Sequence, residues 1–194
     1  KLIFDGSFST LVQADTLWGH LCWLVKWKDG EAALTDFLEA FKNAPPFILS
    51  DAFPGDYLPA PVHISSLVGK GDDRANFREQ KKLKKLEWLS FDEFKTVQKG
   101  QAIKPPDEDR HGFRWTTTLH SSISRLTGTT GVDGSLFEVE EYVLGEGIDH
   151  LSIYLKIKEG WEKRVLALFK DLGKIGYGKK RSVGKGAFEV STFE

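Results

Sequence analysis

The chain of 194 residues has one cysteine, Cys22, no methionine, and no excess of charge of either sign. A single cysteine cannot form an internal disulfide or supply a cysteine zinc cluster, so the composition suits a reducing cytoplasm. We expect Cys22 to be a core residue. The formal net charge of −1 gives no long-range attraction for polyanions. Any nucleic-acid binding must therefore depend on a local patch.

Long hydrophobic runs are also missing. No apolar stretch approaches the roughly 20 residues of a transmembrane helix, and the segment at Lys1 lacks a signal-peptide pattern. We therefore expect a cytoplasmic protein without membrane contact. Hydrophobic residues make up 40% and charged residues 28% of the chain, as in soluble globular proteins. The length fits a single domain over residues 1–194 with a sizeable core.

Glycine and positive charge are concentrated in one place: residues 176–186 contain four glycines and four cations. Glycine adopts positive φ and lets backbone approach a ligand, and successive N–H groups in such a turn can bind an anion. The pattern predicts a phosphate-binding loop with these residues: Gly176, Gly178, Lys179, Lys180, Arg181, Ser182, Gly184, Lys185 and Gly186. The alternative is a glycine-rich turn with solvated lysines. A mononucleotide P-loop is disfavoured, because this loop precedes a strand rather than a helix.

Apolar periodicity predicts the main elements. Strands are expected over 2–13, 136–144, 151–157 and 187–193, and helices over 15–27, 31–42 and 161–172. We expect Asp15 to cap the first helix, Gly173 to end the last, and Ser90 with Glu93 to form a capping box.

Read in order, these elements give β-α-β-β-α-β, the order of a ferredoxin-like fold of the RNA-recognition-motif type. The predicted fold class is therefore α+β and ferredoxin-like, with a glycine-rich loop before the last strand. A long insertion, about residues 43–134, follows the first helix, and insertions of this length are usually functional or disordered. Its basic run, residues 78–86, indicates a solvated helix face, with RNA contact as the second possibility.

Five other segments accompany the loop in a characteristic order. They are Asp15-Thr-Leu-Trp-Gly-His-Leu-Cys-Trp, Pro46-Phe-Ile-Leu-Ser-Asp-Ala-Phe-Pro, Tyr57-Leu-Pro-Ala-Pro, Lys81-Lys-Leu-Lys-Lys-Leu-Glu-Trp-Leu and His120-Ser-Ser-Ile-Ser-Arg-Leu-Thr-Gly-Thr. Together they cover most of the chain. The set resembles the RAMP superfamily of CRISPR effector complexes, and within it the type III-A (Csm) subunit that caps the crRNA 5′ end. That subunit usually carries a second ferredoxin-like half after the loop, which we do not find before Glu194.

The resemblance implies a non-catalytic scaffold that needs no cofactor and no metal. Such a subunit holds the repeat-derived 5′ tag of the crRNA and meets target RNA indirectly. It docks the large, polymerase-like Csm subunit, which makes cyclic oligoadenylates, and it packs against the first backbone Csm subunit. A protruding element helps to kink the guide near its first bases.

Two further groups of residues are candidates for RNA binding. The first is His120, Ser121, Ser122 and Arg125, which combine hydroxyl donors with a guanidinium. Its alternative is a strand-to-turn segment with exposed polar side chains. The second group is Thr16 and His20, because the resemblance places the glycine loop near the start of the first helix, where N–H groups attract phosphate. Its alternative is simple capping by Asp15 beside a surface histidine.

Acidic residues on the strand predicted over 136–144 argue against RNA binding at that strand. Glu138, Glu140 and Glu141 predict a solvated or partner-facing edge and argue against RNA on that side. They do not form a metal site, since no second cluster of ligands accompanies them.

Two other functions are compatible with the residues. A metal-independent RAMP endoribonuclease that processes CRISPR repeats would need His20 or His120 beside a lysine or tyrosine at the scissile phosphate. A lone histidine without an evident partner is more often structural. A general RNA-recognition module is the other alternative, but the strands lack its aromatic-rich pattern.

Overall fold

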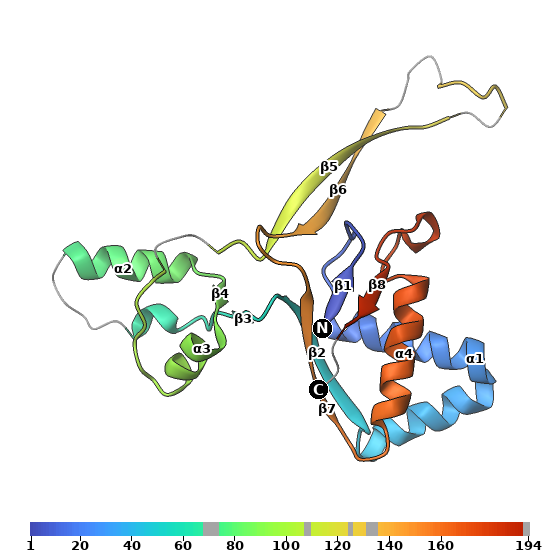
Figure 1. Ribbon diagram of the computed structural model, residues 1–194, viewed down its shortest axis with the longest axis horizontal. Coiled ribbons are helices and arrows are strands. Elements are labelled where there is room, and N and C mark those ends of the chain that lie inside the picture. The colour runs from blue at the N-terminus through green and yellow to red at the C-terminus, as the bar shows by residue number, and fades with distance from the viewer. Residues whose placement is uncertain (68–73, 107–109, 124–125, 131–135, 192–194) are drawn as a thin grey trace.

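Four strands form the central sheet of the computed structural model, which describes residues 1–67, 74–106, 110–123, 126–130 and 136–191 (Figure 1). The strands are β1 (Leu2–Phe4), β2 (Phe47–Pro54), β7 (Leu151–Ile157) and β8 (Phe188–Val190). Their order across the sheet is β2-β7-β1-β8, and each strand is antiparallel to its neighbours. The first strand of the chain therefore lies inside the sheet, between the last two.

Helices α1 (Ala14–Asn43) and α4 (Glu162–Ile175) lie on one side of this sheet (Figure 1). Leu17, Leu21 and Leu24 recur at helical spacing along α1 and are buried in the main core. Burying one such side chain contributes about 1.5–3 kcal/mol. The two helices predicted before residue 43 are both present within α1, and the break between them lies at Gly30, whose backbone is non-helical with φ of 90° and ψ of 178°.

The long excursion leaves the sheet after β2, and the predicted insertion over 43–134 is misplaced. We expected residues 136–144 to be the strand beside β7, but β2 occupies that place, from the pair Phe47–Ile157 to the pair Pro54–Leu151. The excursion thus spans residues 55–150. A bulge between Leu49 and Ala52 interrupts the alternation of β2, so hydrophobic periodicity did not reveal this strand.

The excursion has two parts, which project in different directions in Figure 1. One is a long hairpin, the arm, formed by β5 (Phe113–Ser121) and β6 (Leu136–Leu144). The other is a small lobe. It contains β3 (Leu58–Pro59), the 3-10 turn η1 (Ile64–Ser66), α2 (Arg74–Lys85), β4 (Trp88–Leu89) and α3 (Phe91–Gln98). The lobe has its own core of Ile64, Leu83, Leu89 and Val97. The predicted Ser90–Glu93 capping box at α3 is confirmed.

Two predictions about helix ends are wrong. The N-cap of α1 is Gln13, and the amide of Ala14 donates to Asp51 Oδ1 of β2 at 2.7 Å, so Asp15 lies in the first turn instead. Gly173 lies inside α4, which ends at Ile175 with Gly176 as its C-cap. Glycine is needed at 173 for a different reason, because a Cβ there would be 2.1 Å from the carbonyl oxygen of Phe188 in β8.

Among the described helices, none combines the length and apolar character required to cross a membrane.

Candidate nucleic-acid interface

The glycine loop, residues 176–186, is fastened to the segment that precedes α1. Tyr177 is buried, and its hydroxyl donates to the carbonyl of Leu11 at 3.0 Å and accepts from the amide of Gln13 at 3.2 Å. The amide of Tyr177 donates to the carbonyl of Gly186 at 2.8 Å. A Cβ at Gly186 would lie 2.0 Å from the Tyr177 carbonyl oxygen, and φ there is +73°, so only glycine closes the loop this way.

A surface cavity of about 450 Å³ separates the loop from the start of α1. Its lining consists of Thr10, Gln13, Thr16, His20, Tyr177, Gly178, Lys179 and Arg181. The structure therefore brings the predicted residues Thr16 and His20 together with three of the predicted loop residues. That they bind RNA stays a prediction.

Backbone N–H groups contribute less to this site than the sequence suggested. Four loop amides already donate to loop carbonyls, those of Tyr177, Val183, Gly184 and Lys185, the last three around the 3-10 turn η2 (Arg181–Val183). At the start of α1 the amides of Ala14 and Thr16 donate to Asp51 and Asp15. A phosphate there would meet two carboxylates, so the predicted contact with free helix amides is not supported. Charge at the site comes from side chains.

The four loop cations are not equivalent, because Glu141 of β6 reaches the loop. Its carboxylate is 1% exposed, lies 2.7 Å from Lys185 Nζ and accepts from Ser7 Oγ at 2.7 Å. Lys180 Nζ is 3.7 Å from its other oxygen. The hydrogen bond from Lys185, followed by those from Ser7 and the positive charge nearby, holds the pKa of Glu141 below its ordinary value despite burial. The prediction of a solvated or partner-facing acidic edge is wrong for Glu141, which is buried inside the protein, whereas Glu138 and Glu140 are exposed.

Lys179 and Arg181 are the cations that face the cavity. Neither forms an ion pair with any residue that the structure describes. The Arg181 guanidinium lies over the Trp27 ring, 5.4 Å from its centroid. His20 packs edge-on against Tyr177 with centroids 5.4 Å apart. Burial, and then the charge of Arg181, lower the pKa of His20, which favours a neutral imidazole at neutral pH. Ser182 within η2 and Gly184 directly after it are exposed.

The second predicted group lies elsewhere. His120 and Ser121 belong to β5 near the far end of the arm, where the His120 ring stacks on Phe137 at 5.6 Å. Ser122 follows directly, and Arg125 lies outside the described residues. Since no cavity residue comes from the arm, the structure separates the two predicted groups.

Sequence reasoning missed three lining residues, Thr10, Gln13 and Tyr177. Tyr177 carried a signal, since it stands between two loop glycines and a large aromatic in a flexible turn requires an anchor. Thr10 and Gln13 carried none, because they reach the site only through the fold.

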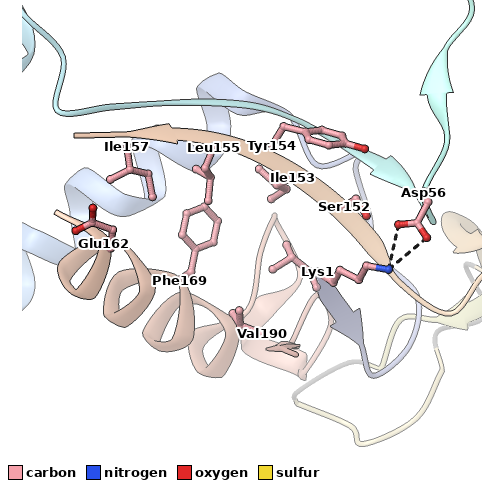
Figure 2. Close-up of a pocket in the computed structure, with 11 residues that line it drawn as sticks. Lys1, Asp56, Ser152, Ile153, Tyr154, Leu155, Ile157, Glu162, Phe169 and Val190 are labelled. Carbon is pink, nitrogen blue, oxygen red and sulfur yellow. Dashed lines mark hydrogen bonds and ion pairs between the residues drawn. The ribbon is translucent and has the colours of Figure 1, made fainter. Parts of the chain in front are cut away.

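A second cavity, of about 600 Å³, opens between β7 and α4 (Figure 2). Figure 2 shows Leu155, Ile157 and Phe169 at one end and the ion pair of Lys1 with Asp56, 3.0 Å, at the other. The apolar lining and the paired lysine suit a polyanion poorly. The loop cavity is therefore the better candidate for nucleic acid.

Comparison with known proteins identifies the family of this chain. A model of the RAMP superfamily matches residues 3–189, and the chain belongs to that superfamily. A protein of Thermococcus onnurineus (strain NA1), CRISPR system Cms protein Csm4, is 26% identical over 202 residues, covering 100% of this chain and 67% of the relative. The resemblance to a Csm RAMP subunit that the sequence segments indicated is thus confirmed.

Solved structures show the same fold. A chain in the crystal structure of a Csm1–Csm4 cassette in complex with cA4 superimposes with a TM-score of 0.69 at 22% identity, covering 92% of this chain and 66% of the other. A chain of a Csm3–Csm4 subcomplex from a type III-A interference complex gives 0.59 at 14% identity, covering 97% and 67%. This chain therefore spans about two thirds of the length of these relatives.

Proposed function

We propose that the protein is a non-catalytic, crRNA-binding scaffold subunit of a type III-A CRISPR effector complex, and that it holds the 5′ tag of the crRNA. One observation carries this proposal: Lys179 and Arg181, free of carboxylates among the described residues, face a cavity that Tyr177 fixes against the start of α1. Two cations without carboxylate partners among the described residues, beside hydroxyl and amide side chains, match a phosphodiester backbone. The RAMP membership and the Csm relatives make crRNA the fitting polyanion.

We infer that the frame of this site is ferredoxin-like. Leaving out the excursion, the elements follow the order β1-α1-β2-β7-α4-β8 with the sheet order β2-β7-β1-β8. This is the β-α-β-β-α-β pattern of that fold. The loop before the last strand then sits at the start of the first helix because both adjoin the central strand β1.

The partners we propose are the large polymerase-like subunit and the first backbone subunit. In solved structures, relatives with this fold occur in complexes named Csm1–Csm4 and Csm3–Csm4. The arm exposes large apolar side chains, among them Trp115, Leu119 and Phe137. We assign it as the protruding element that contacts the guide near its first bases.

One observation favours the alternative, a repeat-processing endoribonuclease: His20, with its lowered pKa, lies beside Lys179 and Arg181 in one cavity. General acid–base attack by the 2′-OH would also need a proton donor at the leaving oxygen. Tyr177 does not serve, since its hydroxyl is buried and bound to Leu11 and Gln13. Purified protein should leave repeat RNA intact in EDTA, whereas cleavage that His20→Ala abolishes would establish the nuclease.

The test of RNA binding is an affinity measurement across salt concentrations. Labelled 5′-tagged RNA is titrated with the protein, with the double variant Lys179→Ala/Arg181→Ala, and with Lys163→Ala/Lys170→Ala, which removes two exposed lysines of α4. The loop variant should lose at least about tenfold in affinity, and its slope of log K against log salt should shrink by about 1.4, near 0.7 per phosphate. The α4 variant should behave like the parent. Equal curves for all three proteins would remove the loop from the site.

A further inference from the structure

Helix α1 presents two large aromatic rings to solvent beside the glycine loop. Thr16, His20, Trp23 and Trp27 follow one another at intervals of four, three and four residues, which places them on one helix face. The first two line the loop cavity. Trp23 and Trp27 continue the same face and are 53% and 54% exposed. The opposite face of α1 supplies the core, so the fold itself does not require these rings.

The two rings form one surface. Their centroids are 5.6 Å apart with planes tilted by 37°, which is contact distance for an aromatic pair. No base fits between them, so a ligand can reach only their outward sides.

This surface is continuous with the proposed phosphate site. Arg181 belongs to the loop cavity, and its guanidinium lies 5.4 Å from the centroid of Trp27. Lys26 Nζ lies 5.5 Å from the centroid of Trp23 and also pairs with Glu31. Cations therefore border both rings, and the one on Trp27 is the cation that we assign to a phosphate.

The combination of exposed indole rings and neighbouring cations indicates which kind of ligand binds this surface. Proteins that bind single strands combine a cationic track for phosphates with aromatic rings on which successive bases stack. A protein interface of hot-spot type would surround the indoles with further apolar side chains. Here a cation lies over each ring, Lys26 over Trp23 and Arg181 over Trp27, and Lys28 of the same helix pairs with Asp171.

We propose that Trp23 and Trp27 are a stacking platform for nucleobases of the same single-stranded RNA whose phosphates bind Lys179 and Arg181. The inference rests on the proposed function and adds to it the way in which the bases are held. Any base can stack on an aromatic ring, so the platform strengthens RNA binding and guides the course of the strand, but it does not read the base sequence. Arg181 has two roles, binding a phosphate and covering one side of Trp27.

The experiment crosses two protein changes with one RNA change. The proteins are the parent, Trp23→Ala/Trp27→Ala, Lys179→Ala/Arg181→Ala, and the control Phe91→Ala, an exposed ring under Lys95 on α3, away from the loop. The RNAs are the 5′-tagged single strand and the same strand with consecutive abasic sites in the tag, which keep every phosphate. Affinity is measured at several salt concentrations, and thermal melts verify that each variant is folded.

On intact RNA, the tryptophan variant should lose about tenfold or more in affinity per ring with an unchanged salt slope, since stacking neutralises no phosphate. On abasic RNA the parent should fall to the level of that variant, and the variant should lose nothing further. The Phe91 control should follow the parent on both RNAs. Trp23→Phe/Trp27→Phe, which keeps ring faces, should recover most of the binding.

Three other outcomes would contradict one of the two proposals, and they can be told apart. Unchanged binding by the tryptophan variant, with loss in the loop variant, overturns the platform and leaves the proposed function standing. Equal losses on intact and abasic RNA also overturn stacking, because the rings then act only by placing Arg181. Unchanged binding by the loop variant overturns the proposed function itself.

Discussion

Glu141 decides how the glycine loop presents its charge. Composition alone treats Lys179, Lys180, Arg181 and Lys185 as one cluster. The single buried carboxylate of Glu141, in strand β6 of the arm, forms an ion pair with Lys185 at 2.7 Å and lies near Lys180. The loop is thereby tied to β6, and its remaining charge is turned toward the cavity beside α1.

Replacing this carboxylate should weaken the fold. Glu141→Gln removes the counter-charge from Lys185 and leaves buried polar groups poorly matched, which costs about 1–3 kcal/mol. Urea unfolding should show this loss. Glu140→Gln, one residue away on the exposed face of β6, should change the free energy of unfolding by less than about 0.5 kcal/mol. Equal stabilities of the two variants would mean that the buried pair contributes nothing.

The ion pair of Glu141 with Lys185 makes the free energy of unfolding depend on pH in a direction that can be stated. The pKa of Glu141 in the folded protein lies below its ordinary value of 4.5, so the folded state favours the ionised form. Its contribution to stability is fully present above pH 4.5 and is lost as the pH falls through the folded pKa. The difference in unfolding free energy between the parent and Glu141→Gln should therefore be constant near neutral pH and shrink below about pH 4.5. A difference that grows on acidification would contradict the assignment.

Packing between α4 and β8 depends on one glycine. Alanine inside a helix is normally preferred over glycine by about 1 kcal/mol. Gly173→Ala should nevertheless destabilise the protein by about 1–3 kcal/mol, because the new Cβ would lie 2.1 Å from the Phe188 carbonyl and push the two elements apart. Gly19→Ala in α1 is the matched control. A Cβ there meets nothing within 4 Å, so this change should stabilise the protein. Thermal melts of both variants decide the matter, and a stabilised Gly173 variant would refute the packing argument.

Strands and helices with unbroken periodicity were predictable, and those shaped by long-range contacts were not. Strict alternation from Leu151 to Ile157 identified β7, and helical spacing identified α4. The bulge in β2 hid that strand. Residues 136–144 were recognised as a strand, yet alternation does not reveal a pairing partner, and β5 rather than β7 is the neighbour.

The candidate site likewise has features that follow from local sequence and features that depend on long-range contacts. Glycine and lysine content located residues 176–186, since that composition is a local property. The involvement of Glu141 was hidden, because the contact joins residues 141, 7 and 185 through the fold. The cap of α1 was misassigned for a similar reason: Asp51 reaches it from β2, while Asp15 is only near in sequence.

At the scale of the whole molecule, several large apolar side chains are exposed to solvent away from the central sheet. Phe77, Phe91, Trp115 and Leu119 are each about half exposed or more, and they come from the lobe and the arm. Co-expression with the large Csm subunit should raise the soluble yield and protect the segment 78–115 from protease, because aromatic side chains are frequent interface anchors. A monodisperse protein that gives identical digests with and without this partner would argue against the scaffold assignment.

The place of β1 in the sheet sets an order of events during synthesis on the ribosome. Among the described strands, β1 pairs with β7 and β8 alone, through Leu2 with Leu151 and Leu2 with Val190. At about 5–20 residues per second, the nascent chain carries an unpaired β1 for on the order of ten seconds. The arm and the lobe join residues much closer in sequence, and such local contacts form faster. The arm and the lobe can thus fold first. The central sheet is completed only when β8 has been synthesised, and until then its unpaired apolar strands are exposed to chaperones or to wrong pairing.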